Sequence, residues 1–121
     1  MKKAKGIVIL LSCLLYCGSA YAHAHLTAVA PADGMVVTSS PSTLSLTFTE
    51  SLAGKLSGAT LKGPDGKPVA TGPTSLGAAD NRTMNIAMPA ELGAGAYTVD
   101  WHAFSDDGHT TRGTYHFTVG R

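Results

Sequence analysis

Apolar and polar residues alternate along several short stretches of this chain, which is the pattern of a β-strand that buries one face. The alternation is clearest at residues 44–48, 84–88, 97–103 and 115–119, and shorter apolar stretches lie at 26–30 and 59–61. No stretch shows convincingly the three-to-four-residue apolar period of an amphipathic helix. The pattern therefore predicts about seven short strands.

Turn-forming residues separate the predicted strands at regular intervals. Clusters rich in Gly, Pro and Asp lie at 31–34, 63–66 and 93–95. The second cluster predicts a hairpin that returns through Val69, whereas residues 73–81 are polar and small and are predicted as a loop. Many short strands with frequent turns indicate an all-β fold, either an antiparallel, immunoglobulin-like β-sandwich or a Greek-key β-barrel. Trp101, in the longest predicted strand, is expected to fill the space between the sheets.

The first 22 residues have the pattern of a secretory signal peptide. Three lysines precede an apolar run at 7–16, and Ala20 and Ala22 occupy the small-residue positions that signal peptidase requires. Cleavage after Ala22 predicts an exported domain at residues 23–121, located in the periplasm. An alternative cut before Cys17, as in a lipoprotein, is disfavoured because Tyr16 is bulky where a small residue is expected. The apolar run is also shorter than the roughly 20 residues of a membrane span.

Composition limits the classes of function open to the exported domain. The full chain has 121 residues, so cleavage leaves enough for one domain. Both cysteines, Cys13 and Cys17, lie in the predicted signal, so we expect no disulfide and no thiolate ligand. Three of the nine basic residues are lost with the signal, and six then stand against eight acidic ones. The negative balance argues against a nucleic-acid partner.

Cleavage after Ala22 would create metal-binding chemistry at His23. The new α-amine and the imidazole are two nitrogen donors on one residue, and they can close a chelate ring on one ion. The segment Asp107–Gly108–His109 is a second candidate, because side chains two residues apart in an extended chain project to the same side. Alone, such a segment is more often a turn with a solvated histidine. Together with His23 it offers three nitrogens and one oxygen, a set that suits one tetragonal Cu(II) ion.

The remaining histidines leave alternatives open. His25 is third from the new amine, so residues 23–25 could wrap a square-planar ion through the amine, two amide nitrogens and the His25 ring. That arrangement would leave the Asp-x-His segment without a role at the metal. We favour a place for His25 beside the site or in its outer sphere, because a strand at 26–30 restrains the amides. The other two histidines are predicted on outward strand faces: His102 and His116.

In these features the chain resembles the CopC/PcoC family of periplasmic copper-binding proteins. The resemblance spans the exported region and is carried by HAHL after the cleavage site, the PADG turn, LSLTFTESL, SGATLKG, TMNIAMPAELGAGAYTVDW, and SDDGH followed by GTYHFTV. It implies a seven-stranded Greek-key barrel with a Cu(II) site near one end. By resemblance, the family's amino-terminal histidine falls on His23 and its Asp-x-His pair on Asp107 and His109. A glutamate that is sometimes near the copper falls on Glu50.

Two departures from the family pattern bear on the metal. Some members hold Cu(I) in a methionine-rich loop, but the corresponding stretch here, LKGPDGKPVA, contains neither methionine nor histidine. Met84 and Met88 are predicted in the core and are poor substitutes, so the sequence argues against a Cu(I) site. Gly108, with Thr110 where proline is frequent in the family, is expected to loosen the loop without removing a ligand.

The expected function is that of a binding protein, not an enzyme. It would capture one Cu(II) ion for storage or for transfer to an inner-membrane importer of the CopD type, in copper homeostasis or resistance, as a monomer or weak dimer. One alternative is a copper oxidase resembling the polysaccharide monooxygenases, which also bind copper at an amino-terminal histidine, although the sequence shows no aromatic stripe suited to a substrate platform. Another is a plain β-sandwich interaction module with incidental metal binding.

Overall fold

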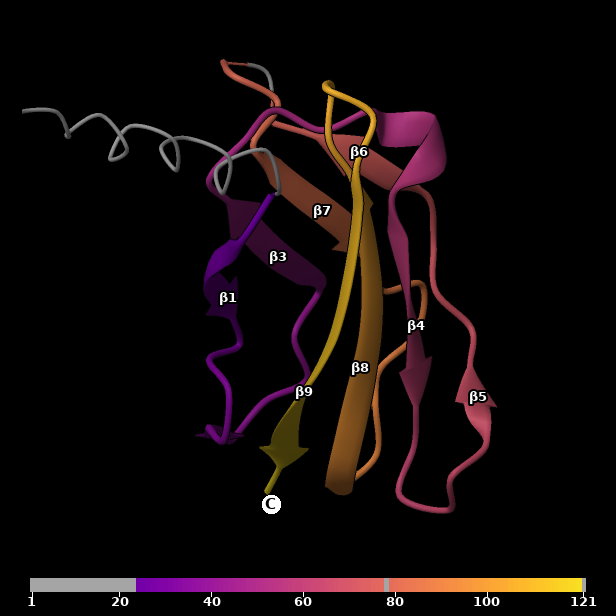
Figure 1. Cartoon of the computed structure of the whole chain (residues 1–121). Helices are drawn as coiled ribbons and strands as arrows, with labels where there is room; N and C mark the ends of the chain where they lie inside the picture. The colour runs from indigo at the N-terminus through magenta and orange to yellow at the C-terminus, as the bar shows by residue number, and fades with distance from the viewer. Residues whose placement is uncertain (1–23, 78, 121) are drawn as a thin grey trace, which may run out of the picture.

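The protein folds as two β-sheets packed face to face, seen in a computed structural model that describes residues 24–77 and 79–120 (Figure 1). The elements in chain order are β1 (Leu26–Ala30), β2 (Val36–Val37), β3 (Thr43–Phe48), the 3₁₀ turn η3 (Gly54–Leu56), β4 (Gly58–Lys62), β5 (Pro68–Val69), β6 (Thr74–Leu76), β7 (Thr83–Ala87), β8 (Gly95–Phe104) and β9 (Thr110–Val119). One sheet has the order β1-β3-β7-β6 and the other β2-β9-β8-β4-β5. The pairings are antiparallel apart from that of β2 with β9.

This architecture confirms the predicted all-β fold class. The hairpin around residues 63–66 is confirmed by the pairing of Leu61 with Val69. The loop predicted at 73–81 is wrong in part, because β6 lies within it. The described residues contain nine strands instead of about seven; β2, β5 and β6, of two or three residues, are too short to show alternation. All three lie at sheet edges, where a strand needs only one neighbour.

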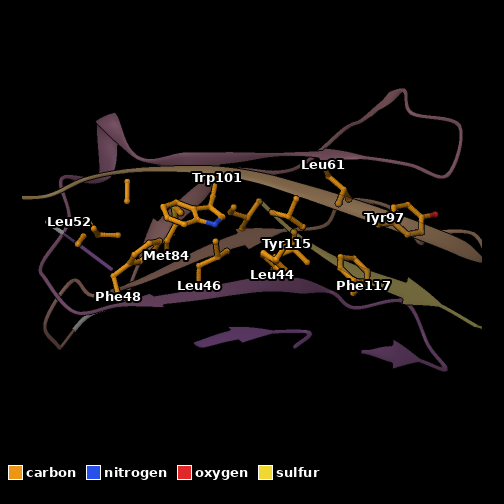
Figure 2. Packing of buried hydrophobic residues seen from close by; sticks show 14 of the residues in the cluster. Leu44, Leu46, Phe48, Leu52, Leu61, Met84, Tyr97, Trp101, Tyr115 and Phe117 are labelled. Carbon is orange, nitrogen blue, oxygen red and sulfur yellow. The ribbon is translucent and has the colours of Figure 1, made fainter. Parts of the chain in front are cut away.

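The core lies between the sheets and is made by the inward half of each alternating strand (Figure 2). In β3, Leu44, Leu46 and Phe48 are buried while the residues between them are only partly covered. The facing sheet contributes a matching set from β8 and β9: Tyr97, Val99, Trp101, Ala103, Tyr115, Phe117 and Val119. The period-two pattern of the sequence is therefore the pattern of burial.

Trp101 occupies the interior, as predicted, and its indole meets the ring of Phe48 edge to face, with centroids 5.2 Å apart (Figure 2). Its cross-strand partner on β9 is Gly113. A Cβ at Gly113 would lie 2.4 Å from the indole carbon Cζ2, inside any real contact distance. The absence of a side chain on β9 at this point is what allows the large ring to lie flat between the sheets.

One end of the sandwich collects the segments that carry the candidate ligands. The β8–β9 turn and η3 lie at this end, opposite the end where β9 finishes (Figure 1). Backbone hydrogen bonds hold the turn to the segment after β3: the Asp106 amide donates to the Ser51 carbonyl, and the Ala53 amide to the Phe104 carbonyl. Among the described residues, no helix is long and apolar enough to cross a membrane.

Candidate metal centre

The loop between β8 and β9 is a closed turn that presents Asp107 and His109. The Gly108 amide donates to the Ser105 carbonyl, and the Ser105 amide donates to the His109 carbonyl, both at 2.9 Å. Gly108 has a φ of +94°, which a residue with a Cβ rarely adopts. The glycine therefore permits the conformation that these hydrogen bonds close, and the expectation that it loosens the loop stays a prediction.

Asp107 and His109 are brought together, as their spacing predicted. The imidazole Nδ1 of His109 lies 3.1 Å from Oδ1 of Asp107, and the His109 amide donates to the same oxygen at 3.3 Å. Both side chains are about half exposed, at 49% and 42%. The pair therefore forms a fixed carboxylate–imidazole unit that remains open to an ion from solution.

A buried serine completes the environment of the Asp107 carboxylate. Ser105 is 1% exposed, and its hydroxyl donates to Oδ1 of Asp107. This hydrogen bond is the main reason that the pKa of Asp107 is lowered; partial desolvation opposes it, and the His109 contacts lower the pKa further. The carboxylate is consequently ionised at neutral pH, as a metal ligand must be.

The start of the described chain is attached to β9 beside this loop. The Thr111 hydroxyl donates to the Ala24 carbonyl at 2.8 Å, across 87 positions of sequence, and Ala24 itself is 1% exposed. His25 is held from the other sheet: its amide donates to Oγ1 of Thr49, and its carbonyl accepts from the Thr49 amide, both at 2.9 Å. Residues 24 and 25 are thus fixed at the end that carries the Asp107–His109 pair.

Glu50 lies at the same end of the sandwich as Asp107 and His109, because the residues on either side of it are hydrogen-bonded there. Thr49 bonds to His25, and the Ser51 carbonyl accepts from the amide of Asp106. The Glu50 backbone therefore lies between the segment that begins the described chain and the loop that carries the predicted ligands. The residue is half-buried.

The predicted signal peptide and His23 lie outside the described residues. Within residues 24–77 and 79–120, no third His, Cys, Asp or Glu joins Asp107 and His109 to form a metal-binding group. An ionised carboxylate beside an imidazole fits a divalent transition metal, but two side chains make only half of a four-ligand site.

The other histidines lie on the outer face of the five-stranded sheet, as predicted. His102 pairs with Arg112 and His116 with Thr98 across β8 and β9. A shallow hollow of about 480 Å³ lies on this face, and its polar lining comprises Thr60, Asp100, His102, Arg112 and Thr114. This hollow is therefore separate from the Asp107–His109 pair.

Sequence reasoning did not single out Ser105, Thr111 or Thr49, although each holds part of the site. For Ser105 a signal existed. The inward positions of β8 continue at every second residue through Trp101 and Ala103 to Ser105, which places a hydroxyl in the buried register. A buried hydroxyl requires a partner, so that position indicated a hydrogen bond into the following loop.

Comparison with known proteins shows the family. A family model described as the CopC domain matches residues 26–120. Protein YobA of Escherichia coli K12 is 38% identical over 110 residues, which cover 91% of this chain and 89% of YobA. Copper resistance protein C of Pseudomonas syringae pv. tomato is 32% identical over 124 residues, with 98% of each chain covered.

A solved structure agrees with the fold. The crystal structure of PcoC, a methionine-rich copper resistance protein from Escherichia coli, matches with a TM-score of 0.72 and 39% identity, covering 81% of this chain and 99% of PcoC. With a matched domain spanning nearly all of the described residues and a sandwich shared with PcoC, this chain belongs to the CopC family of copper resistance proteins.

Proposed function

We propose that the domain binds one Cu(II) ion in the periplasm through the α-amine and imidazole of His23, the imidazole of His109 and the carboxylate of Asp107. The observation that carries this proposal is the hydrogen bond from Thr111 to Ala24. Consecutive Cα atoms are about 3.8 Å apart, so the residue joined to Ala24 begins within reach of the loop two positions before Thr111. Signal cleavage after Ala22 then supplies the two missing nitrogens at that place.

The donor set favours Cu(II) over other divalent ions. Three nitrogens and one carboxylate oxygen suit a tetragonal ion, and Cu(II) has the highest affinity of the first-row divalent metals for such ligands. With Nδ1 of His109 against Asp107, a neutral imidazole carries its lone pair on Nε2. While this contact lasts, Asp107 orients the ring and raises its basicity from the outer sphere, so Asp107 becomes a ligand only when its carboxylate turns from Nδ1 to the ion.

The alternative in which residues 23–25 wrap the ion through their amides is less well supported. The His25 amide nitrogen, which that arrangement requires in deprotonated form, donates a hydrogen bond to Thr49. Wrapping would have to break this bond. We therefore place His25 beside the copper, with Glu50 as a further residue of the outer sphere.

A Cu(I) site is not part of the proposal. Thioether sulfur is the ligand that selects Cu(I). PcoC is described as methionine-rich, whereas this chain has four methionines. Met84 is fully buried, Met88 packs against the core, and Met35, which is 48% exposed, stands in the turn before β2.

The bound copper is stored or passed to an inner-membrane importer of the CopD type, and the half-exposed Asp107–His109 pair makes the ion accessible to such a partner. Neither the copper resistance protein nor PcoC is named as an enzyme, which supports a carrier over an oxidase. The same donor set serves storage and transfer.

Copper titration of histidine variants tests the proposal. Protein beginning at His23 is titrated with Cu(II), and its electron paramagnetic resonance spectrum is recorded for the wild type, His109→Ala and His116→Ala. We expect His109→Ala to lose the native spectrum and to bind at least roughly 10- to 100-fold more weakly, because one ligand is removed. His116→Ala, on the exposed outer face of β9, should behave as wild type. A native spectrum in His109→Ala would overturn the proposed ligand set.

A further inference from the structure

Ala24 and His25, the first two residues that the structure describes, are attached to the two sheets by side-chain hydroxyls. Thr49 follows β3, and its hydrogen bonds with His25 hold the chain to the four-stranded sheet. Thr111 belongs to β9 in the five-stranded sheet, and its hydroxyl reaches Ala24. Among the hydrogen bonds of the described residues, the Thr111–Ala24 bond is the one that ties residues 24–30 to the sheet from which the metal-binding loop projects.

The attachment of β1 to β3 is irregular where the strand begins. β1 is an edge strand, and its register with β3 shifts at its beginning, where Leu26 pairs with Phe48 but Ala28 with Thr47. Such an irregularity marks a place where the ladder is locally interrupted. The entry of the chain into β1 is therefore the part of this strand that the sheet holds least regularly.

Thr111 lies close enough to the loop to set this position. It is two residues after His109, about 7 Å along an extended strand. Its hydroxyl is half-buried and occupied by the Ala24 carbonyl, and the small Ala24 side chain fits into the core cluster. The pair fixes the chain at one residue from the new amino terminus and two residues from His109.

We propose that Thr111 is a positioning residue, which anchors Ala24 to β9 and so holds the mature amino terminus at the distance from His109 that copper requires. This inference rests on the proposed function. Thr111 does not itself bind the metal, and it acts before any metal arrives. The anchor is therefore present in the metal-free protein. Because residues near Ala24 are already ordered, less conformational entropy is lost when copper binds.

Three substitutions isolate the hydroxyl. Thr111→Val removes the donor while keeping the branched shape, and Thr111→Ser keeps the donor. Thr114→Val is the matched control, because the Thr114 hydroxyl donates at 2.7 Å to Asp100 at an exposed site on the same strand. All variants begin at His23 and are studied first without metal and then with Cu(II).

In the metal-free protein, nuclear magnetic resonance order parameters are measured for the His25 amide and the Ala24 methyl group. We expect the Ala24 methyl group to become more mobile in Thr111→Val, whereas the His25 amide keeps its hydrogen bonds with Thr49 and changes little. Neither group should change in Thr111→Ser or Thr114→Val. Cu(II) affinity should then be roughly 2- to 10-fold weaker in Thr111→Val alone, which is the loss of one ordinary hydrogen bond.

An unchanged order parameter of the Ala24 methyl group in Thr111→Val would overturn the role of Thr111 as an anchor. Increased mobility with unchanged copper affinity and spectrum would overturn the positioning role. Either result, obtained beside a wild-type protein that binds Cu(II) normally, leaves the proposed function standing. A wild-type protein that binds no Cu(II) overturns the proposed function and the positioning role together.

Discussion

At the scale of single residues, one carboxylate oxygen organises the candidate site. Oδ1 of Asp107 accepts from the Ser105 hydroxyl and the His109 amide and lies against the His109 imidazole. These contacts fix the direction of the carboxylate and the ring before any metal arrives. They also keep the pKa of Asp107 low, with the Ser105 hydrogen bond as the largest cause.

Replacement of Ser105 should therefore be visible in the titration of Asp107. We expect Ser105→Ala to raise the pKa of Asp107 toward its ordinary value, because the charged form loses its strongest hydrogen bond. The carboxyl carbon resonance of Asp107 in the metal-free protein, followed against pH, measures this change. Ser57→Ala is the control, since that buried hydroxyl bonds to the Ala53 carbonyl and accepts from the Phe104 amide. An unchanged Asp107 titration in Ser105→Ala would contradict the assignment.

A second residue carries a polar group with no partner. Among the described residues, the buried hydroxyl of Tyr115 has no hydrogen-bond partner, and burial is the main reason that its pKa rises to about 12, with the nearby Asp33 charge adding to the effect. Tyr115→Phe should leave the free energy of unfolding unchanged or raise it by about 1 kcal/mol, because an unpaired buried group is removed.

Tyr97→Phe is the matched control for this prediction. The Tyr97 hydroxyl donates to the Gly93 carbonyl at 2.7 Å, so its loss should lower the unfolding free energy by about 1 kcal/mol. Urea unfolding of both variants measures the difference. The reverse order of stability would show that the Tyr115 hydroxyl is paired in solution.

Residue types and spacing were enough to select Asp107 and His109, but the two side chains meet in a turn with Gly108 at positive φ and not in the extended chain from which the spacing argument started. Thr111 could not be selected in this way. Its hydroxyl bonds to a backbone carbonyl 87 positions away, and no local pattern encodes that contact.

At the scale of elements, the length of the β8–β9 ladder determines where the turn with Asp107 and His109 lies relative to the core. The two strands pair from Gly95–Val119 to Phe104–Thr110, and the turn that holds the ligands begins directly after this ladder. The indole of Trp101 packs over its cross-strand partner Gly113 on the core side of this ladder, so the pairing of the two strands and the packing of the core depend on each other at that point.

A side chain at Gly113 should disturb the core. We expect Gly113→Ala to lower the free energy of unfolding by about 1–3 kcal/mol, because the new methyl group would lie 2.4 Å from the indole of Trp101 and force the ring or the strand to move. Thermal unfolding and the near-ultraviolet circular dichroism of the tryptophan measure the effect. Gly93→Ala is the control, since nothing lies within 4 Å of a Cβ built there. Equal stability of Gly113→Ala and Gly93→Ala would show that the Trp101 indole has room to move away from a methyl group at position 113.

The long strands could be predicted because each spans several alternations with one buried face. The short edge strands could not, since two or three residues show no period and their pairing is decided by the neighbouring strand. Thus the alternation predicts β8 and the second half of β9, whereas it shows neither the first half of β9 nor β6, which lies in the predicted loop.

At the scale of the whole molecule, the fold brings residues 24 and 25, the end of β3 and the β8–β9 turn to one end. Alternation predicted the sheets but not which ends meet, because strand order depends on contacts far apart in sequence. The expectation that His23 and His109 meet came from the donor set that they form with Asp107 and from resemblance to the CopC family. The described hydrogen bonds of Ala24 and His25 now give that expectation a physical basis.

The central claim is that signal cleavage creates a copper ligand at His23. Its most direct test is Cu(II) titration, followed by electron paramagnetic resonance, of protein that begins at His23 and of protein with one glycine added before His23. The added residue keeps every side chain but removes the amine from the histidine. We predict a changed spectrum and at least roughly tenfold weaker binding in the extended protein. Identical spectra and affinities would contradict the claim.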